Sequence, residues 1–151
     1  ILIGVSYALM KMSEQHKLDL SNWIVMETGG MKGRRKEITR KQLHIQLINS
    51  FNTKIIQSEY GMTELLSQAY SSGKGVYTTP PWMKVFTRDT EDALTFISGK
   101  TGGINVIDLA NLYSCSFIAT QDLGKTLPDG SFEILGRFDT SDIRGCNLMV
   151  L

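Results

Sequence analysis

The sequence predicts an α/β protein in which a partial parallel α/β sheet layer is followed by a β-rich antiparallel or barrel subdomain. Up to about Gly75, strand-like apolar runs alternate with runs at near-helical spacing, an order that is typical of a largely parallel sheet. From Val76 onward, short β-rich runs are separated by Pro, Gly, Asp and Asn, which favours an antiparallel sheet or a small barrel. The composition, with 42% hydrophobic and 21% charged residues in 151, is typical of a globular domain.

The first 75 residues are expected to contain three strands and three helices. Leu43 and Leu47 lie on one face of the second helix, and Thr39 is its expected N-cap. The third helix is expected to stop at Gly73. In chain order, we expect a strand at 1–4, a helix at 5–16, a strand at 21–30, a helix at 37–52, a strand at 53–61 and a helix at 63–73.

The remainder is expected to form short strands at 76–89, 93–98, 102–110, 116–124 and 131–139. The hairpin signal is strongest at LPDGSFEIL, where Pro128, Asp129 and Gly130 supply turn chemistry between two apolar runs. The chain therefore divides into an α/β part at 1–75, a β-rich part at 76–136 and a terminal segment at 137–151.

Charge and cysteine content narrow the class of protein. The net charge of +1, from 16 basic and 15 acidic residues, favours neither nucleic acid nor an anionic membrane as a partner. Cys115 and Cys146, without a secretory leader, are typical of a reducing cytoplasm, where we expect the protein. The apolar first ten residues fall below the roughly 20 that span a bilayer, so we expect no stable membrane insertion. Because Ile1 already lies within an expected core strand, we expect a piece of a longer protein.

The segment EYGMTE lies where a predicted parallel strand meets the next predicted helix. Ligands of such sheets bind beyond the carboxyl ends of the strands. The helix-start amides and the Thr63 hydroxyl can donate to a phosphate, Glu64 can hold Mg²⁺, and the Tyr60 ring can lie against a base. Alternatively, Thr63 and Glu64 only cap the helix and Tyr60 fills the core.

Two later segments, TQDLGK with Asp122 and GRFDTSDIRG with Arg137 and Asp139, follow EYGMTE in the chain. Together the three segments resemble, in kind and order, the motifs of the adenylate-forming superfamily, which includes acyl-CoA synthetases and luciferases. The resemblance implies ATP and Mg²⁺ as cofactors. It also implies a fragment of the large domain, covering nearly all of this chain, with a hinge at Asp139 between that domain and a small C-terminal one.

The same resemblance implies a role for each matching residue. Binding of ATP would involve the Tyr-Gly-Met-Thr-Glu segment, a glycine loop near adenine, a carboxylate on the ribose hydroxyls and an arginine. These residues are Gly29 and Gly30 near adenine, Tyr60, Gly61 and Met62 beside it, Thr63 at the α-phosphate, Glu64 on Mg²⁺, Asp122 on the ribose and Arg137 on the nucleotide.

Within the superfamily, METGGMKGRRKEITR and the ending GRFDTSDIRGCNLMVL look most like the acyl-protein synthetases of bacterial luminescence. Such enzymes activate a fatty acid and pass the acyl group to a protein cysteine, which implies Cys146 as the acceptor and an acyl-reductase as a possible partner. Cys146 is otherwise a small hydrophobe in a terminal strand. Coenzyme A as acceptor, or a catalytically inactive nucleotide-binding or protein-interaction module, are the alternatives. The oligomeric state is left open.

The superfamily's upstream phosphate loop does not occur between Ile1 and Tyr60, and the lysine of its small domain is also missing. We therefore expect the isolated chain to be inactive. We expect either that the parent protein continues beyond Leu151 or that it is a short form that ends near its cysteine. His16 and His44 have no second ligand at metal spacing, so surface or packing roles are expected for both.

Overall fold

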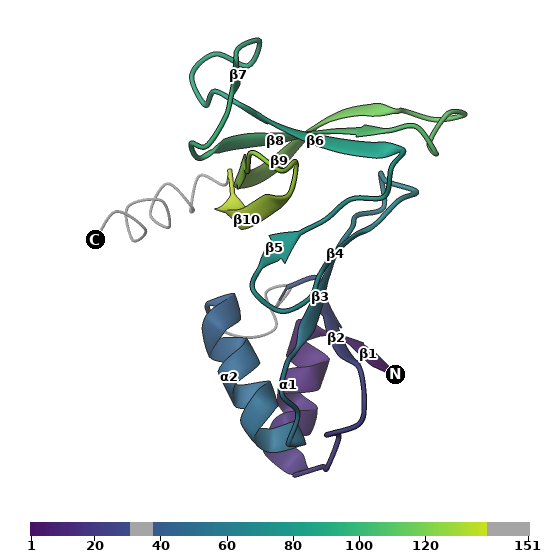
Figure 1. The fold of residues 1–151 in the computed structure, drawn as a ribbon, viewed down its shortest axis with the longest axis vertical. Helices are drawn as coiled ribbons and strands as arrows, with labels where there is room; N and C mark the ends of the chain where they lie inside the picture. The colour runs from purple at the N-terminus through teal and green to yellow at the C-terminus, as the bar shows by residue number, and fades with distance from the viewer. Residues whose placement is uncertain (31–37, 139–151) are drawn as a thin grey trace. The chain divides into compact units, whose positions relative to one another are not determined.

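The computed structural model describes residues 1–30 and 38–138 (Figure 1). The chain forms two compact units. The first contains Ile1–Gly61 and Ala69–Gly75, and the second contains Met62–Gln68 and the chain from Val76 onward. Each unit is built around its own sheet. Neither helix in the described ranges is long and apolar enough to cross a membrane.

The first sheet has four strands in the order β1-β2-β3-β4. Strands β1, β2 and β3 run parallel, and β4 pairs antiparallel with β3. The predicted parallel layer is therefore confirmed, with an antiparallel strand at one edge. The strands are β1 (Leu2–Val5), β2 (Val25–Thr28), β3 (Gln57–Tyr60) and β4 (Ala69–Ser71).

Two helices supply the core of the first unit. Helix α1 spans Ser6–Gln15 and α2 spans Arg40–Phe51. The two helices lie side by side against the sheet (Figure 1). Buried residues of both helices pack with one strand residue and two loop residues in one apolar cluster, made of Leu9, Met10, Leu20, Val25, Leu43, Leu47, Phe51 and Ile56.

The start of α2 confirms the predicted N-cap. The Thr39 hydroxyl accepts from the Gln42 amide at 3.3 Å, and the Gln42 side chain accepts from the Thr39 amide at 3.0 Å. This reciprocal pair satisfies two amides that have no partner within the helix. The helix ends at Asn52, whose φ of 46° lies in the left-handed region that asparagine tolerates.

The predicted helix at 63–73 is wrong. The chain there makes turns and then enters β4, where Ser71 pairs with Ser58. Leu65, Ser67 and Ala69 are buried at every second position, which is the period of an extended chain. Helix-favouring residues such as Leu and Ala suggested a helix, but strand pairing and the side-chain bonds of this segment outweigh that weak preference.

The second sheet has six antiparallel strands in the order β5-β10-β9-β8-β6-β7, which confirms the β-rich antiparallel part. The expected strand at 76–89 is split in two around Pro80 and Pro81, since proline cannot donate to a strand ladder. The strands are β5 (Val76–Tyr77), β6 (Met83–Arg88), β7 (Phe96–Ile97), β8 (Gly102–Asp108), β9 (Phe117–Thr126) and β10 (Phe132–Arg137).

The predicted LPDG hairpin is confirmed between β9 and β10. Gly130 takes a φ of 84°, and its amide donates to the Leu127 carbonyl at 3.0 Å. Asp129 accepts from the Ser131 amide at 3.0 Å, which fixes the turn. Phe132 follows at once and stacks on Tyr77, with ring centroids 5.5 Å apart.

Two glycines let the strands of this sheet approach closely. Gly102 of β8 and Gly124 of β9 are partners in register. A Cβ atom at Gly124 would lie 2.1 Å from the Glu133 carbonyl oxygen, and one at Gly102 would lie 2.1 Å from the Arg88 carbonyl oxygen. Side chains are therefore excluded at both positions by neighbouring backbone.

Candidate functional site

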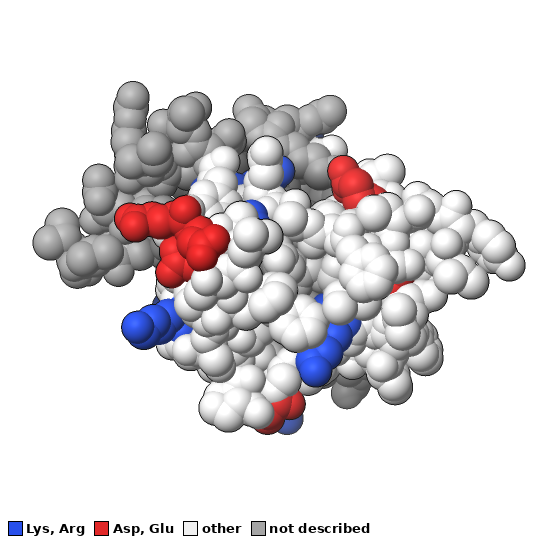
Figure 2. Space-filling model, turned by 90° about the horizontal axis from the view of Figure 1, so that it is seen from above, with Lys and Arg blue, Asp and Glu red and all other residues white. Residues whose placement is uncertain are grey.

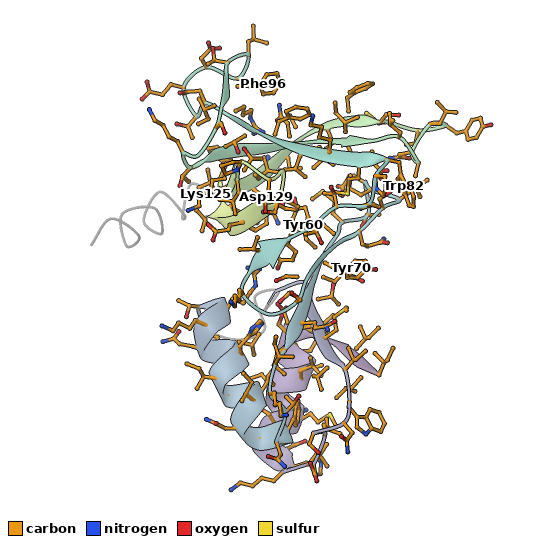
Figure 3. The ribbon with its side chains drawn as sticks, in the orientation of Figure 1. Tyr60, Tyr70, Trp82, Phe96, Lys125 and Asp129 are labelled. Atoms are coloured by element: carbon orange, nitrogen blue, oxygen red, sulfur yellow. The ribbon has the colours of Figure 1, made fainter. Side chains whose placement is uncertain are left out.

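Parallel strands β2 and β3 end at the same edge of the first sheet. Thr28 and Glu59 are partners in register, and the Thr28 hydroxyl donates to the Glu59 carboxylate at 2.9 Å. Gly29 follows Thr28 with a φ of 66°, which a residue with a side chain rarely adopts. The topology thus brings Gly29 and Gly30 to the edge where Tyr60 ends β3. Tyr60, labelled in Figure 3, is 8% exposed, and Gly61 after it is exposed.

A buried carboxylate, Glu27, organises this edge. It is 3% exposed and accepts from the Ser6 hydroxyl at 2.8 Å. Arg40 Nε lies 3.3 Å and His44 Nε2 lies 3.5 Å from Glu27 Oε1. The Ser6 oxygen is also 2.8 Å from the Gly29 carbonyl. The network therefore ties both helices to the loop that begins at Gly29.

A shallow pocket of about 150 Å³ opens beside this network. It is lined by Ser6, Glu27, Gly29, Gly30, Ile38, Arg40 and Leu43. Sequence reasoning singled out the two glycines and missed Glu27. The signal was present, because a charged residue two positions after Val25 falls on the inward face of an apolar strand.

The environment of Glu27 favours its charged form. Burial by itself raises the pKa of a carboxyl group. Hydrogen bonds from His44, Ser58 and Ser6, together with the charge of Arg40, outweigh burial and hold the pKa of Glu27 below its ordinary value. His44 therefore has a packing role, as expected, and a specific carboxylate partner.

Thr63 and Glu64 lie on the Met62–Gln68 segment, which belongs to the second unit. Both residues are exposed. Because no helix begins here, the predicted helix-start amides for a phosphate are absent from this segment, which is a correction to the sequence analysis. The backbone is instead held by side chains: Asn111 donates to the Glu64 carbonyl at 2.8 Å, and Asp108 accepts from the Ser67 amide at 2.8 Å.

Asp122 and Arg137 face each other across β9 and β10. They are partners in register, and Arg137 Nε lies 3.6 Å from Asp122 Oδ1. The Asp122 side chain is 14% exposed, whereas that of Arg137 is 65% exposed. The structure therefore brings together these two predicted nucleotide-binding residues within the second unit. Asp139 and Cys146 lie outside the described residues.

Within residues 1–30 and 38–138, no group of three or more His, Cys, Asp or Glu side chains is placed to hold a metal ion. Glu64 is a single exposed carboxylate. A magnesium ion that is brought by a nucleotide typically takes one or two protein carboxylates and completes its shell with phosphate and water. The donor set at Glu64 is of this kind.

No family model and no curated protein matches the chain, but solved structures do. ATP-bound MatB from Rhodopseudomonas palustris is 18% identical over 90% of this chain and 30% of that chain, with a TM-score of 0.66. Coronafacic acid ligase from Pectobacterium brasiliense is 18% identical over 89% of this chain and 29% of that chain, with a TM-score of 0.62. O-succinylbenzoate coenzyme A synthetase from Bacillus subtilis, in complex with ATP and magnesium ion, is 18% identical over 89% and 31%, with a TM-score of 0.59.

The chain has a fold similar to that of one segment of each of these three structures. It spans about 30% of the length of these ligases. This likeness in fold agrees with the resemblance that the EYGMTE, TQDLGK and GRFDTSDIRG segments suggested.

Proposed function

We propose that this chain is part of an ATP-dependent ligase that activates a carboxylic acid as an acyl-adenylate. The observation that carries the proposal is the likeness in fold to ATP-bound ligases, over 90% of the chain. The chain's own residues agree with it. Tyr60 ends β3 at the carboxyl edge of the parallel strands, and exposed Thr63 and Glu64 follow on a segment whose backbone is held by Asp108 and Asn111.

The residues present suit the nucleotide and its metal. The Thr63 hydroxyl is a donor for a phosphate oxygen, and the Glu64 carboxylate is a ligand type that Mg²⁺ prefers. Asp122 offers two oxygens to the two vicinal hydroxyls of a ribose, and the exposed Arg137 guanidinium can reach a phosphate or the sugar. ATP, when bound, supplies an α-phosphate that a carboxylate can attack with loss of pyrophosphate. The residues bind, orient and balance the developing charge.

The surface charge is consistent with a small-molecule substrate. On the face that Figure 2 shows, Lys and Arg side chains are scattered singly among acidic and uncharged residues. With a net charge of +1, this pattern gives no extended basic patch, of the kind that nucleic acid favours, among the described residues of that face.

The test is acid-dependent exchange of pyrophosphate into ATP by the full-length protein, with a panel of fatty and aryl acids. Replacing Glu64 by Gln keeps its size and removes its charge, so exchange should fall by about 10²-fold or more. Glu91→Gln, an exposed carboxylate in the loop after β6, is the control and should retain wild-type exchange. Absence of acid-dependent exchange from the wild-type protein would contradict the proposed function. An unchanged rate in Glu64→Gln at limiting Mg²⁺ would mean that Glu64 does not bind the metal.

As the finer form of this proposal, the acid is a fatty acid and the acceptor is the thiol of Cys146, as in an acyl-protein synthetase. The Cys146 thiolate would attack the acyl carbonyl and form a C–S bond. The bond between the carbonyl carbon and the phosphate oxygen would break, and AMP would leave. An acyl-reductase would then be the natural consumer of the thioester. The support is the resemblance of METGGMKGRRKEITR and of the last residues of the chain to such enzymes.

Coenzyme A is the second candidate acceptor. It is favoured by the fold likeness to two enzymes, O-succinylbenzoate coenzyme A synthetase and benzoate CoA ligase, the latter with a TM-score of 0.57 and 16% identity. A nucleotide-binding or interaction module without catalysis is the third. A phosphate loop in the gene's upstream sequence would support the enzyme, and its absence would support the module.

Labelled fatty acid and ATP distinguish the two acceptors. The full-length protein should retain label that neutral hydroxylamine releases, because a thioester reacts readily with this nucleophile, and Cys146→Ser should retain none that hydroxylamine releases. Label that withstands hydroxylamine, or hydroxylamine-sensitive label on Cys146→Ser, excludes Cys146 as a thioester carrier. In a parallel incubation with added coenzyme A, release of free acyl-coenzyme A with no labelled protein would favour the second acceptor.

A further inference from the structure

The Met62–Gln68 segment is bound by a fully buried carboxylate. Asp108, at the end of β8, has an exposed fraction of 0%. Its Oδ2 accepts from the amides of Leu66 at 2.9 Å and Ser67 at 2.8 Å, and its Oδ1 accepts from the Ser67 hydroxyl at 2.6 Å and the Ala110 amide at 3.2 Å. Four donors therefore converge on one side chain, and three of them come from this segment.

A second buried side chain, Asn111, holds the carbonyl of Glu64 itself. Asn111 is 4% exposed, and its Nδ2 donates to the Glu64 carbonyl at 2.8 Å and to the Cys115 carbonyl at 2.9 Å. Both hydrogens of the Asn111 side-chain amide are thus used, and one of them bonds to Glu64, the residue with the proposed metal contact. The Asn111 backbone amide donates to the Asp108 carbonyl at 3.1 Å, so the two side chains share one turn.

Ser67 completes the attachment. Its hydroxyl donates to Asp108 and accepts from Trp82 Nε1 at 2.9 Å (Trp82 is labelled in Figure 3). The backbone from Glu64 to Ser67 is therefore bonded at one carbonyl and two amides to residues of the β8 end. The side chains of Thr63 and Glu64, by contrast, are exposed.

We propose that Asp108 and Asn111 are positioning residues that fix Glu64 for its metal contact, an inference that rests on the proposed function. A buried carboxylate costs free energy unless it is fully hydrogen-bonded, and apolar packing can hold a turn without that cost. Here the buried polar groups are directed at the backbone of the segment with the exposed carboxylate. Catalytic geometry must be held to within about half an ångström, and supporting hydrogen bonds are the usual means.

The first test needs no ATP. Amide hydrogen exchange in the ligand-free protein should show protection at Leu66 and Ser67, and Asn111→Leu or Ser67→Ala should raise their exchange rates by about tenfold or more while leaving the amides of β6 protected. Asp129→Asn is the matched control, because Asp129 accepts from the amide two residues on in the same way as Asp108 but lies in the β9–β10 turn. It should leave Leu66 and Ser67 unchanged.

The second test is a double-mutant cycle in the full-length protein. Asn111→Leu should raise the Mg²⁺ concentration for half-maximal ATP–pyrophosphate exchange by about tenfold, the usual minimum for loss of a group that orients a metal ligand. In the Glu64→Gln background the same change should alter exchange by less than about twofold, since residues that act as one unit are not additive. Ser67→Ala, which removes one hydroxyl, serves if Asn111→Leu does not fold.

The outcomes separate the two proposals. Exchange that falls in Glu64→Gln but falls additively with Asn111→Leu, or amides of Leu66 and Ser67 that exchange freely in the wild type, would overturn the positioning role alone. A wild-type protein without acid-dependent exchange would overturn the proposed function and the positioning role with it. Loss of Mg²⁺ affinity that disappears in the Glu64→Gln background supports both.

Discussion

Glu27 is a charged residue that the fold has taken out of water. Its carboxylate is 3% exposed, yet Ser6 of α1, Arg40 and His44 of α2 and Ser58 of β3 all face it. An unpaired carboxylate at this depth would be strongly destabilising. With these partners, Glu27 instead links the two helices to the strand end from which Gly29 and Gly30 follow.

Removing this charge should destabilise the protein in a pH-dependent way. Glu27→Gln should lower the free energy of unfolding by about 2 kcal/mol at neutral pH, because hydrogen bonds to a charged group are lost. The pKa of Glu27 is below its ordinary value of 4.5 in the folded state, so the unfolded chain binds the proton first as the pH falls. The wild type should therefore lose its advantage over the variant below about pH 4.5.

Urea unfolding of both proteins across the acid range measures this difference. Glu133→Gln is the control. Glu133 forms a partly exposed ion pair with Lys125, and such pairs contribute about 1 kcal/mol or less to stability. A wild-type advantage that persists unchanged in acid would mean that folding does not lower the pKa of Glu27.

For single residues, the sequence predicted positions that follow from a local strand or turn pattern. Gly29, Gly30 and Tyr60 were expected at one strand edge, and parallel pairing of β2 with β3 brings them there. The roles of Asp108 and Asn111 were not predicted. Their bonds reach back 41 and 47 residues along the chain, and no local periodicity encodes a contact of that range.

The strands of the second sheet depend on small residues at specific registers. Gly124 of β9 lies against the Glu133 carbonyl of β10, and the register of the two strands shifts at a bulge between Ile134 and Gly136. Gly136 itself has open space where a side chain would be. Neighbouring glycines of one hairpin thus have opposite tolerance of a methyl group.

Gly124→Ala should destabilise the second unit by about 1–3 kcal/mol, because the added methyl group would force β10 away from β9. Gly136→Ala should change stability by less than about 0.5 kcal/mol. Thermal unfolding of the two variants provides the comparison. Equal melting temperatures would show that β10 moves aside without cost.

Helices and turns were predictable where the local sequence pattern agrees with the tertiary contacts of the segment. Both helices of the first unit and the LPDG turn were expected, since caps and turn residues act over a few positions. The prediction of a helix at 63–73 was wrong because these residues form a loop bonded to Asp108 and then a strand paired with β3. Buried and exposed positions alternate along both parts. Helical propensity is a fraction of a kcal/mol per residue, which a few buried hydrogen bonds exceed.

For the whole molecule, the chain spans about 30% of the length of the proteins that it resembles in fold. The phosphate-loop motif that the proposed function requires does not occur between Ile1 and Tyr60. Residues 1–151 expressed separately should therefore give no acid-dependent ATP–pyrophosphate exchange under conditions where the full-length protein does. Robust exchange by the separate chain would show that these residues hold a complete site.

The assignment of Met62–Gln68 to the second unit also sets an order of events during synthesis. Leu66 and Ser67 leave the ribosome 42 and 41 residues ahead of Asp108, which accepts from their amides. The strands β1, β2, β3 and β4 can pair before that point, but the Leu66 and Ser67 amides gain their partner only after Asp108 has emerged. A nascent chain halted before Asp108 would thus present a folded helical layer with its Thr63–Glu64 segment still unanchored. We infer that the Met62–Gln68 segment acquires its final conformation later than the first sheet, whose strands lie on both sides of it in the chain.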